Sequence, residues 1–428
     1  EYDMEEYYGR QLVQPKIKNV PAYVSVAATF NNHICQRCGQ TDIEKLPNYH
    51  FYCRACLALG RVSSRDVLLS LPEPNLFDGH DILSWSGKLT AKQQEVSNEL
   101  IATLKEKNEH LVWAVTGAGK TEMLFPVIHK ALTQRYRVGI VSPRVDVIIE
   151  LAPRLQAAFS KTDMVVLHGE QTQDYRYTPL VLATTHQMLR FKSAFDLLIV
   201  DEVDSFPYAG DKMLSYAVQQ AKKATGTLIF LTATPTKQLQ KRVRRGSLKT
   251  SYLPLRYHQH LLPVIKTTLV GNWRRKIPKQ LVKQLTHFQR TEQRFLIFVP
   301  KVADLKKVYD QINKHVPHLK GDYVHAADSR RQEKVQAMRD YQLQYLVTTT
   351  ILERGVTFPG IDVLILGADD TTFSENALVQ IAGRVGRKND RPTGLVRAYV
   401  QHISLNVVAA QRQIKQMNHR GKKLGGRK

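Results

Sequence analysis

Residues 114–121 read AVTGAGKT, and they follow the strand-like apolar run Leu111–Val115. The mixed polar and apolar stretch after Thr121 is typical of a helix. Strand, glycine-rich loop, Lys-Thr and helix in this order form the P-loop arrangement, with Ala114 where the general pattern has its first glycine. An accidental glycine-rich turn would not require this order, so the stretch predicts a phosphate-binding loop.

Each residue of this loop has an expected role in binding a nucleotide. Thr116, Gly117 and Gly119 would line the phosphates, since glycines let successive backbone N–H groups point inward. Lys120 would add a positive charge for the β and γ phosphates, and Thr121 a hydroxyl ligand for Mg²⁺. The dipole of the following helix favours the same anion. We therefore predict ATP and Mg²⁺ as cofactors.

The regions around the loop indicate the fold class. Strand-like apolar runs alternate with helical stretches in residues 87–250, and the alternation recurs in residues 251–428, as in doubly wound parallel sheets. This predicts an α/β protein with two parallel-sheet lobes. The expected strands are Leu111–Val115, Arg137–Val141, Met164–Leu167, Leu197–Val200, Thr227–Leu231, Arg294–Val299, Gly321–Val324, Tyr345–Thr348, Val363–Leu366 and Leu395–Val400.

A second element of a nucleotide site is the sequence DEVD at 201–204. The apolar run before it would deliver Asp201 and Glu202 to the carboxyl end of a strand, where ligands bind in open α/β sheets. Asp201 would hold Mg²⁺, and Glu202 would orient and deprotonate the attacking water. Alone, DEVD could be an acidic turn. Gln93, about one helix before the P-loop, could pair with adenine through its two-sided amide.

All four cysteines of the chain lie between positions 35 and 56, in two CxxC pairs separated by 14 residues. This spacing is typical of structural zinc sites, so Cys35, Cys38, Cys53 and Cys56 predict a zinc module within residues 1–80. Disulfides are the alternative, which a reducing cytosol disfavours. Before the module, we expect a mobile arm to about Ala22.

The charge balance indicates a partner class. Of the formal net charge of +24, residues 1–86 carry −2, residues 87–250 carry +8 and residues 251–428 carry +18. A basic excess suits a polyanion, although a merely basic surface explains it equally well. The acidic start resembles no secretory signal and no run is long enough to span a bilayer, so we predict a cytoplasmic protein. We expect the basic tail, residues 411–428, to be frayed.

Seven blocks, in order along the chain, resemble the motifs of superfamily 2 helicases. This resemblance implies two RecA-like lobes of the P-loop NTPase class. The blocks are AVTGAGKT at 114–121 (motif I), SPR at 142–144 (Ia), TTHQ at 184–187 (Ic), DEVD at 201–204 (II), TATP at 232–235 (III), TTTILERGVTFP at 348–359 (V) and QIAGRVGR at 380–387 (VI).

Motif VI is expected to act on the nucleotide from the second lobe. Gln380, Arg384 and Arg387 recur at spacings of four and three, which predicts one helical face. By the resemblance, Arg384 or Arg387 would be the arginine finger and Gln380 a nucleotide contact. Without the P-loop, a solvent-exposed basic helix would be the preferred interpretation. Thr232 and Thr234 would link the γ-phosphate state to closure of the lobes.

The resemblance also implies contacts with a nucleic-acid strand. Arg144, Thr185 and Thr349 would touch its backbone. A further block on the same side would consist of Asp328, Ser329 and Arg331. In motif V, Thr357 stands where many relatives have aspartate, so a ribose contact is not expected there.

The four-cysteine module in front of a PriA-like helicase core resembles the ComFA family of late-competence proteins, on the stretches AVTGAGKTEM, DEVDSFPY and ILERGVTFP. The resemblance implies an ATPase stimulated by single-stranded DNA. It would help bring transforming DNA through the membrane channel from the cytoplasmic side, with other competence proteins as partners. A replication-restart helicase is an alternative, but its cysteines would be expected inside the second lobe. A zinc-dependent adaptor without ATPase activity is another, against which intact Lys120, Glu202 and Arg387 argue.

Overall fold

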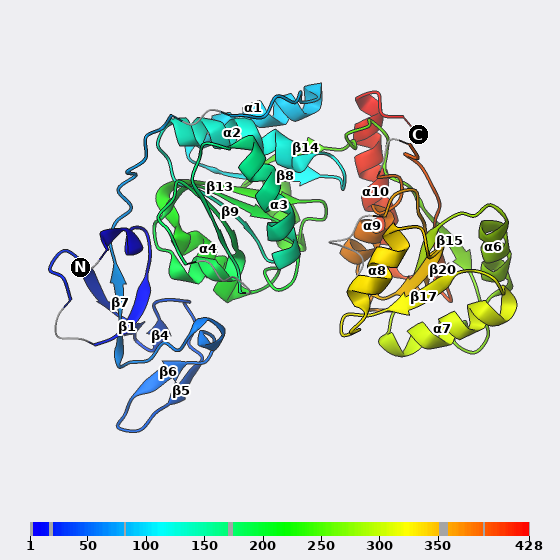
Figure 1. Cartoon of the computed structure of the whole chain (residues 1–428), viewed down its shortest axis with the longest axis horizontal. Helices are drawn as coiled ribbons and strands as arrows, with labels where there is room; N and C mark the ends of the chain where they lie inside the picture. The colour runs from blue at the N-terminus through cyan, green and yellow to red at the C-terminus, as the bar shows by residue number, and fades with distance from the viewer. Residues whose placement is uncertain are drawn as a thin grey trace. The chain divides into compact units, whose positions relative to one another are not determined.

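A computed structural model of the chain describes residues 3–16, 20–80, 83–169, 174–350, 358–387 and 390–427 (Figure 1). The chain forms two compact units. The first comprises Glu1–Trp113 and Lys120–Tyr252, and the second comprises Ala114–Gly119 and Leu253–Lys428. Within the described residues, no helix is long and apolar enough to cross a membrane.

The first unit is built around a seven-stranded sheet in the order β10-β11-β9-β12-β13-β8-β14. Neighbours from β10 to β8 pair in parallel, which confirms the predicted α/β class. The strands are β8 (Glu109–Ala114), β9 (Val138–Ser142), β10 (Met164–Leu167), β11 (Leu180–Thr184), β12 (Phe195–Asp201), β13 (Lys222–Thr232) and β14 (Lys249–Leu253).

Helices cover this sheet, and its central strands are therefore mostly apolar. Every residue of β9 and of β11 is buried, as expected for parallel strands with both faces covered. Helices α2, α3 and α4 flank the sheet (Figure 1). The helical elements are α1 (Ala91–Glu106), α2 (Lys120–Thr133), α3 (Val145–Ala158), the short η3 (Thr185–Arg190), α4 (Lys212–Ala221) and α5 (Lys237–Arg244).

The N-terminal region is ordered, so the expectation of a mobile arm was wrong for most of its residues. Strand β1 (Leu12–Pro15) pairs antiparallel with β7 (Asp66–Ser70), and β7 pairs with β2 (Ser25–Ala28). Two small hairpins carry the cysteines. They are formed by β3 (Phe30–Asn31) with β4 (Ile34–Cys35) and by β5 (Ile43–Lys45) with β6 (Phe51–Cys53).

A buried arginine accounts for the order of the arm. Arg137 donates to Glu73 at 2.8 Å, to the carbonyl of Tyr8 at 3.1 Å and to the hydroxyl of Tyr175 at 2.7 Å. Burial alone would lower the pKa of Arg137, but Tyr175 and Glu73 raise it above its usual value. The charge therefore persists, and it joins Tyr8 of the arm and Glu73 to the sheet.

The second unit contains a six-stranded sheet in the order β15-β20-β19-β16-β18-β17, with every neighbouring pair parallel. It confirms the second predicted lobe. The strands are β15 (Ile265–Leu269), β16 (Phe295–Phe298), β17 (Gly321–Val324), β18 (Tyr345–Thr348), β19 (Asp362–Leu366) and β20 (Val396–Val400). The helices are α6 (Lys279–Arg290), α7 (Val302–His315), α8 (Arg331–Arg339), α9 (Glu375–Ala382) and α10 (Leu405–Lys423).

The basic C-terminal stretch is not frayed, contrary to the sequence-based expectation. It lies mostly in α10, which buries Ile414, Met417 and Gly421. These three residues recur at spacings of three and four, so they share one helical face. The basic residues lie between them and mask this apolar face in the sequence.

Candidate nucleotide site and four-cysteine cluster

Polar motifs end five neighbouring strands of the first sheet. In their spatial order, β11 leads into motif Ic, β9 into motif Ia, β12 into motif II, β13 into motif III and β8 into motif I. The carboxyl ends of parallel strands lie at one edge, which is where open α/β sheets bind their ligands. Motifs far apart in the sequence are thereby gathered at this edge.

Lys120 and Asp201 meet at this edge. Lys120 begins α2, Asp201 ends β12, and the lysine Nζ donates to Oδ1 of the aspartate at 3.2 Å. Burial alone would lower the pKa of Lys120, but Asp201 and Glu202 raise it above its usual value. The lysine therefore keeps its proton. A pocket beside the pair is lined by Lys120, Thr121, Asp201 and apolar side chains.

Glu202 follows in an unusual backbone conformation. Its φ is +53°, in the left-handed region, which costs a residue other than glycine about 1–3 kcal/mol. Its N–H donates to Oδ1 of Asp201 at 2.8 Å, and its Oε2 accepts from the hydroxyl of Ser205 at 3.1 Å. The guanidinium of Arg144 lies 4.0 Å from the same Oε2. The carboxylate is therefore held in a defined position.

Asp204, the last residue of motif II, joins this motif to motif III. Its two carboxylate oxygens accept from the hydroxyls of Thr232 and Thr234 at 2.6 and 2.5 Å. The N–H of Thr234 donates in turn to the hydroxyl of Thr232 at 2.9 Å. No role was assigned to Asp204 from the sequence. Its place two residues after Glu202, within DEVD, was the only available signal.

Three other predicted residues of the first unit lie as follows. Gln93 is buried and forms a capping box at the start of α1, in which its Oε1 accepts from the N–H of Thr90 at 2.9 Å. Arg144 precedes α3 and binds Asp146 through two nitrogens, at 3.0 and 2.6 Å. Thr185 is fully buried at the start of η3. The contacts with adenine and with a nucleic-acid strand stay predictions.

The glycines of the P-loop have the backbone conformations that the loop requires. Gly117 and Gly119 have φ values of +81° and +73°, which glycine adopts at no steric cost. The side chain of Thr116, within the second unit, lies 3.4 Å from the carbonyl of Gly383. The loop therefore has the curled backbone expected of a phosphate site.

Motif VI begins on a helix but ends beyond it. Helix α9 ends at Ala382, so Gln380 is helical, whereas Arg384 lies in the turn that follows and Arg387 comes directly after that turn. Gly386 has a φ of +69°, which no helix continues. The prediction of one continuous helical face was therefore wrong. Arg384 is only 2% exposed, and Nε of Arg387 donates to the carbonyl of Gly383 at 3.3 Å.

The predicted strand contacts of the second unit are only partly described. Thr349 is half-buried directly after β18. Asp328 accepts from Lys334 at 2.9 Å, and this bond lowers the pKa of the carboxyl group. Residues 351–357, including Thr357, lie outside the described residues.

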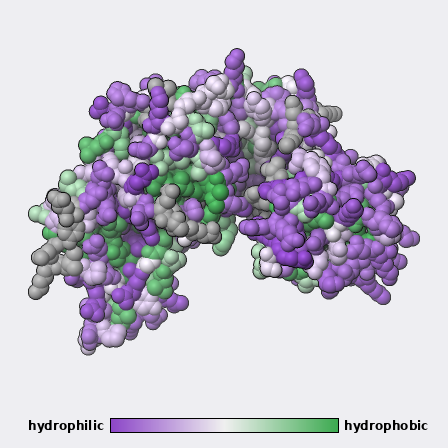
Figure 2. All heavy atoms as spheres, viewed as in Figure 1, coloured by the Kyte–Doolittle hydropathy of each residue, from purple (hydrophilic) through white to green (hydrophobic). Residues whose placement is uncertain are grey.

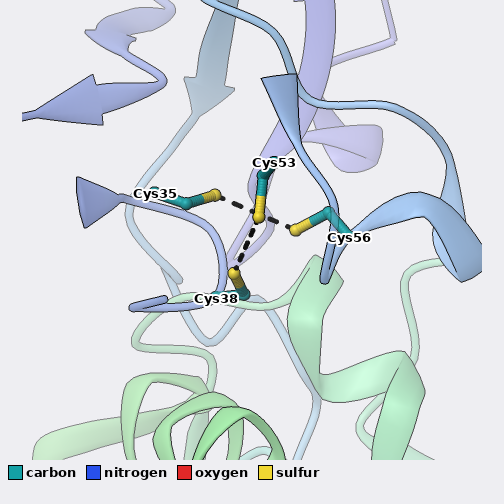
Figure 3. Close-up of side chains that lie close together, drawn as sticks. All are labelled: Cys35, Cys38, Cys53 and Cys56. Atoms are coloured by element: carbon teal, nitrogen blue, oxygen red, sulfur yellow. Dashed lines mark hydrogen bonds between the residues drawn. The ribbon is translucent and has the colours of Figure 1, made fainter. Parts of the chain in front are cut away.

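The four cysteines converge in the N-terminal module, with their sulfur atoms pointing toward one another (Figure 3). Each is at most 1% exposed, and all four sulfurs lie within 4.8 Å of one another. Sγ of Cys35 lies 3.8 Å from that of Cys56, and Sγ of Cys38 lies 3.5 Å from that of Cys53. A tetrahedral zinc ion with Zn–S bonds of about 2.3 Å needs sulfurs about 3.8 Å apart. The cluster is consistent with zinc binding.

This cluster is packed into the first unit. The cysteines belong to the same buried cluster as Met188 and Leu189 of η3 and Leu214 of α4. Next to Cys38, a Cβ added to Gly39 would lie 2.8 Å from the ring of Tyr216, so only glycine fits there. The module is thus joined to the sheet-bearing part of the unit by a continuous apolar core.

The arrangement defines the class of protein. S. cerevisiae Dbp5 bound to RNA and ADP BeF3 has a similar structure, with a TM-score of 0.56 and 14% identity over 77% of this chain and 88% of that chain. Residues 86–237 match the type III restriction enzyme res subunit family, and residues 276–389 match the helicase conserved C-terminal domain. The chain is therefore a helicase-like protein of superfamily 2, with an ATPase of that type.

Closer relatives give the family. Residues 5–70 match the competence protein ComFA N-terminal domain. The competence protein ComFA of Bacillus subtilis (strain 168) is 43% identical, over 96% of this chain and 91% of that protein. The ComFA of Streptococcus pneumoniae (strain ATCC BAA-255 / R6) is 42% identical, over 90% of each. The chain belongs to the ComFA family of competence proteins.

Proposed function

We propose that the chain is an ATP-driven motor that moves along single-stranded DNA during the uptake of transforming DNA. The observation that carries this proposal is the meeting of Lys120, Asp201 and Glu202 at one edge of the sheet. The names of its ComFA relatives support the competence role. The helicase-type fold supports a nucleic-acid substrate.

The residues of the first unit would divide the chemistry of hydrolysis. Lys120 would exchange Asp201 for the β and γ phosphates, and Thr121 with Asp201 would hold Mg²⁺, which supplies charge neutralisation when bound. Glu202 would orient the attacking water and accept its proton. Thr116, Gly117 and Gly119 would present N–H groups or a hydroxyl to the phosphates.

The remaining predicted residues would complete the nucleotide site. Arg384 or Arg387 would stabilise the charge that develops on the transferred phosphoryl group, with Gln380 as a further nucleotide contact. Gln93 would contact adenine. The bonds from Thr232 and Thr234 to Asp204 support a link between motif III and the hydrolytic residues. Through this link, the presence or loss of the γ-phosphate would be coupled to conformational change elsewhere in the motor.

DNA would be held mainly by its phosphates. Residues 251–428 carry a net charge of +18, and hydrophilic side chains cover most of the face of the second unit that Figure 2 shows. Arg144, Thr185 and Thr349 are the proposed backbone contacts. Such contacts read little sequence and weaken with salt. The site of action would be the cytoplasm, at the inner face of the membrane, alongside other competence proteins.

Zinc would serve structure rather than chemistry. Four thiolates complete a tetrahedral shell and leave no position for a substrate. The packing of the cysteines against η3 and α4 supports a role in holding the N-terminal module on the first unit.

Displacement of streptavidin from biotinylated single-stranded DNA tests the motor directly. We expect displacement that requires ATP and is lost in Glu202→Gln, a variant that should still bind ATP and DNA. Constructing the DNA with biotin at either end would give the polarity. ATP-independent displacement, or equal displacement by Glu202→Gln, would contradict the proposal.

A further inference from the structure

Residues 254–262 form a segment without a sequence motif that is hydrogen-bonded to the turn of motif VI. It follows β14, belongs to the second unit and contains Arg256, which is fully buried. The guanidinium donates through Nη1 to the carbonyl of Gly386 and through Nη2 to the carbonyl of Gly383, the latter at 3.3 Å. Nε2 of His258 donates to the same Gly386 carbonyl at 2.9 Å. The turn after α9 is thus bound at both of its glycines.

Arg256 is a buried cation for which the described part of the chain offers no acidic partner. No carboxylate among the described residues lies within ion-pair distance of it, and its Nε has no hydrogen-bond partner. Burial, followed by repulsion from Arg387, lowers the pKa of Arg256 to about 9. A buried and unpaired charge is unfavourable for folding. A role beyond stability would account for an arginine at this position.

The segment is itself fixed by the C-terminal helix. Asn418 of α10 binds the backbone of Leu262 twice, accepting from its N–H and donating to its carbonyl, each at 2.9 Å. Gly421 allows close approach, because a Cβ there would lie 2.8 Å from both Leu255 and Leu261. After the end of α10, the N–H of Arg427 donates to the carbonyl of Gln259 in the segment at 2.9 Å.

The same segment contacts the P-loop backbone, which belongs to the second unit as far as Gly119. The N–H of Tyr257 donates to the carbonyl of Gly117 at 2.9 Å, and the N–H of Val115 donates to the carbonyl of Leu253 at 3.0 Å. Arg256 therefore lies between Leu253 and Tyr257, whose backbones are hydrogen-bonded to Val115 and Gly117. Its side chain binds the motif VI turn.

We propose that Arg256 is a positioning residue, which fixes the turn Gly383–Gly386 and thereby sets Arg384 and Arg387 relative to the P-loop backbone. This inference rests on the proposed function, in which one of those arginines stabilises the transition state. The planar guanidinium suits the task because its two terminal nitrogens reach two carbonyls in a fixed geometry. A lysine at this position can keep one of the two bonds.

Steady-state ATP turnover by Arg256→Met tests the inference. A misplacement of a catalytic group by about 1 Å costs up to about 10²-fold in rate, so we expect kcat to fall by about 10- to 100-fold. The KM for ATP should change by less than about threefold, since ground-state phosphate binding lies elsewhere. Arg256→Lys should recover part of the loss.

A double-mutant cycle separates positioning from general destabilisation. If Arg256 acts through Arg387, adding Arg256→Met to Arg387→Ala should cause no further loss of kcat. Arg294→Met is a matched control. Arg294 is also a buried arginine of the second unit whose guanidinium donates to backbone carbonyls, those of Pro359 and Met338, but it lies just before the amino end of the internal strand β16 and does not contact the motif VI turn through any of these bonds. Its variant should lose stability but retain kcat.

The outcomes distinguish the two proposals. If Arg387→Ala alone leaves turnover within a few-fold, Arg387 is not the finger, and Arg384→Ala takes its place in the cycle; if neither variant is impaired, the finger assignment in the proposed function is wrong. If Arg387→Ala is strongly impaired and Arg256→Met multiplies that loss, or if Arg256→Met has normal kcat, the positioning role is wrong. Should Arg256→Met fail to fold, Arg256→Lys takes its place in the cycle. A partial loss that disappears in the Arg387→Ala background supports the role, and one that persists overturns it.

Discussion

The cationic residues expected to act on the nucleotide have different partners in the two units. In the first unit, the cation Lys120 is bound to the carboxylate of Asp201 at 3.2 Å. In the second, the buried Arg256 and the half-buried Arg387 are bound to backbone carbonyls of one turn. Under the proposed function, a phosphate would therefore compete with a carboxylate for Lys120 in the first unit, whereas an arginine of the second would act on the charge that develops during hydrolysis. Under the proposed function, the first unit would supply Lys120 and the group that activates water, and the second would stabilise the developing charge.

The largest expected effect tests the second half of the comparison. Replacing Arg387 by alanine removes a cation from the turn, and arginine fingers contribute on the order of 10³ to 10⁵ in turnover. We expect a loss in this range, measured as kcat under saturating ATP and DNA. A loss of only a few-fold would assign the role to Arg384 or to a partner protein.

Glu202→Gln tests water activation in the first unit. The amide cannot accept a proton from water, and general bases contribute typically about 10²- to 10⁴-fold. Hydrolysis should fall by this factor while ATP affinity, measured by fluorescent-nucleotide titration, stays close to that of the unchanged protein. Normal hydrolysis would show that another group is the base.

Lys120→Ala is the companion variant, and it distinguishes binding from chemistry. It removes the cation that would meet the phosphates, so both nucleotide affinity and turnover should fall. The expected loss of affinity is about tenfold or more, since charge-assisted hydrogen bonds contribute roughly 1.5–3 kcal/mol. If nucleotide affinity were unchanged, the P-loop would not be the phosphate site.

A smaller effect on catalysis, but a clear one on stability, is expected at the cysteines. Anaerobically purified protein should contain one zinc ion per chain, and finding none would refute the metal site. A module that folded independently would unfold alone on loss of zinc and leave the ATPase intact. Because the cysteines share a core with η3 and α4, we expect Cys53→Ser to lower the unfolding midpoint of the first unit as well. Separate unfolding of the module, with an unchanged midpoint for the rest, would contradict this.

Much of the fold could be predicted because the central strands are buried and continuous in apolar residues. The fully buried Tyr345–Thr348 matches its observed strand at both ends. The edge strands Met164–Leu167 and Gly321–Val324, which are only partly buried, also match at both ends. The strand β15 was not predicted because its sequence, IKTTL, has three polar residues between two apolar ones. It lies at the edge of its sheet, where burial on both faces is not required. The C-terminal helix was missed because its charges hide an apolar face.

Part of the candidate site could be predicted because its residues lie at the carboxyl ends of predicted strands. Asp201 ends β12 and Lys120 follows β8 after one short loop, so the carboxyl ends of two parallel strands bring them together. The bonds of Asp204 span 28 and 30 residues and join two motifs that were read separately. Arg256 lies in an irregular segment without a motif, and only its bonds to Gly383 and Gly386 give it a role.

The central claim is that single-stranded DNA activates the ATPase, and ATP turnover with different nucleic acids tests it most directly. Equal lengths of single-stranded DNA of two unrelated sequences, blunt duplex and RNA would be compared at two salt concentrations. We expect strong stimulation by both single-stranded DNAs, less by duplex and RNA, and a steep decrease at higher salt because the contacts are with phosphates. Equal stimulation by RNA would contradict the role in DNA uptake, and no stimulation by any nucleic acid would contradict the motor itself.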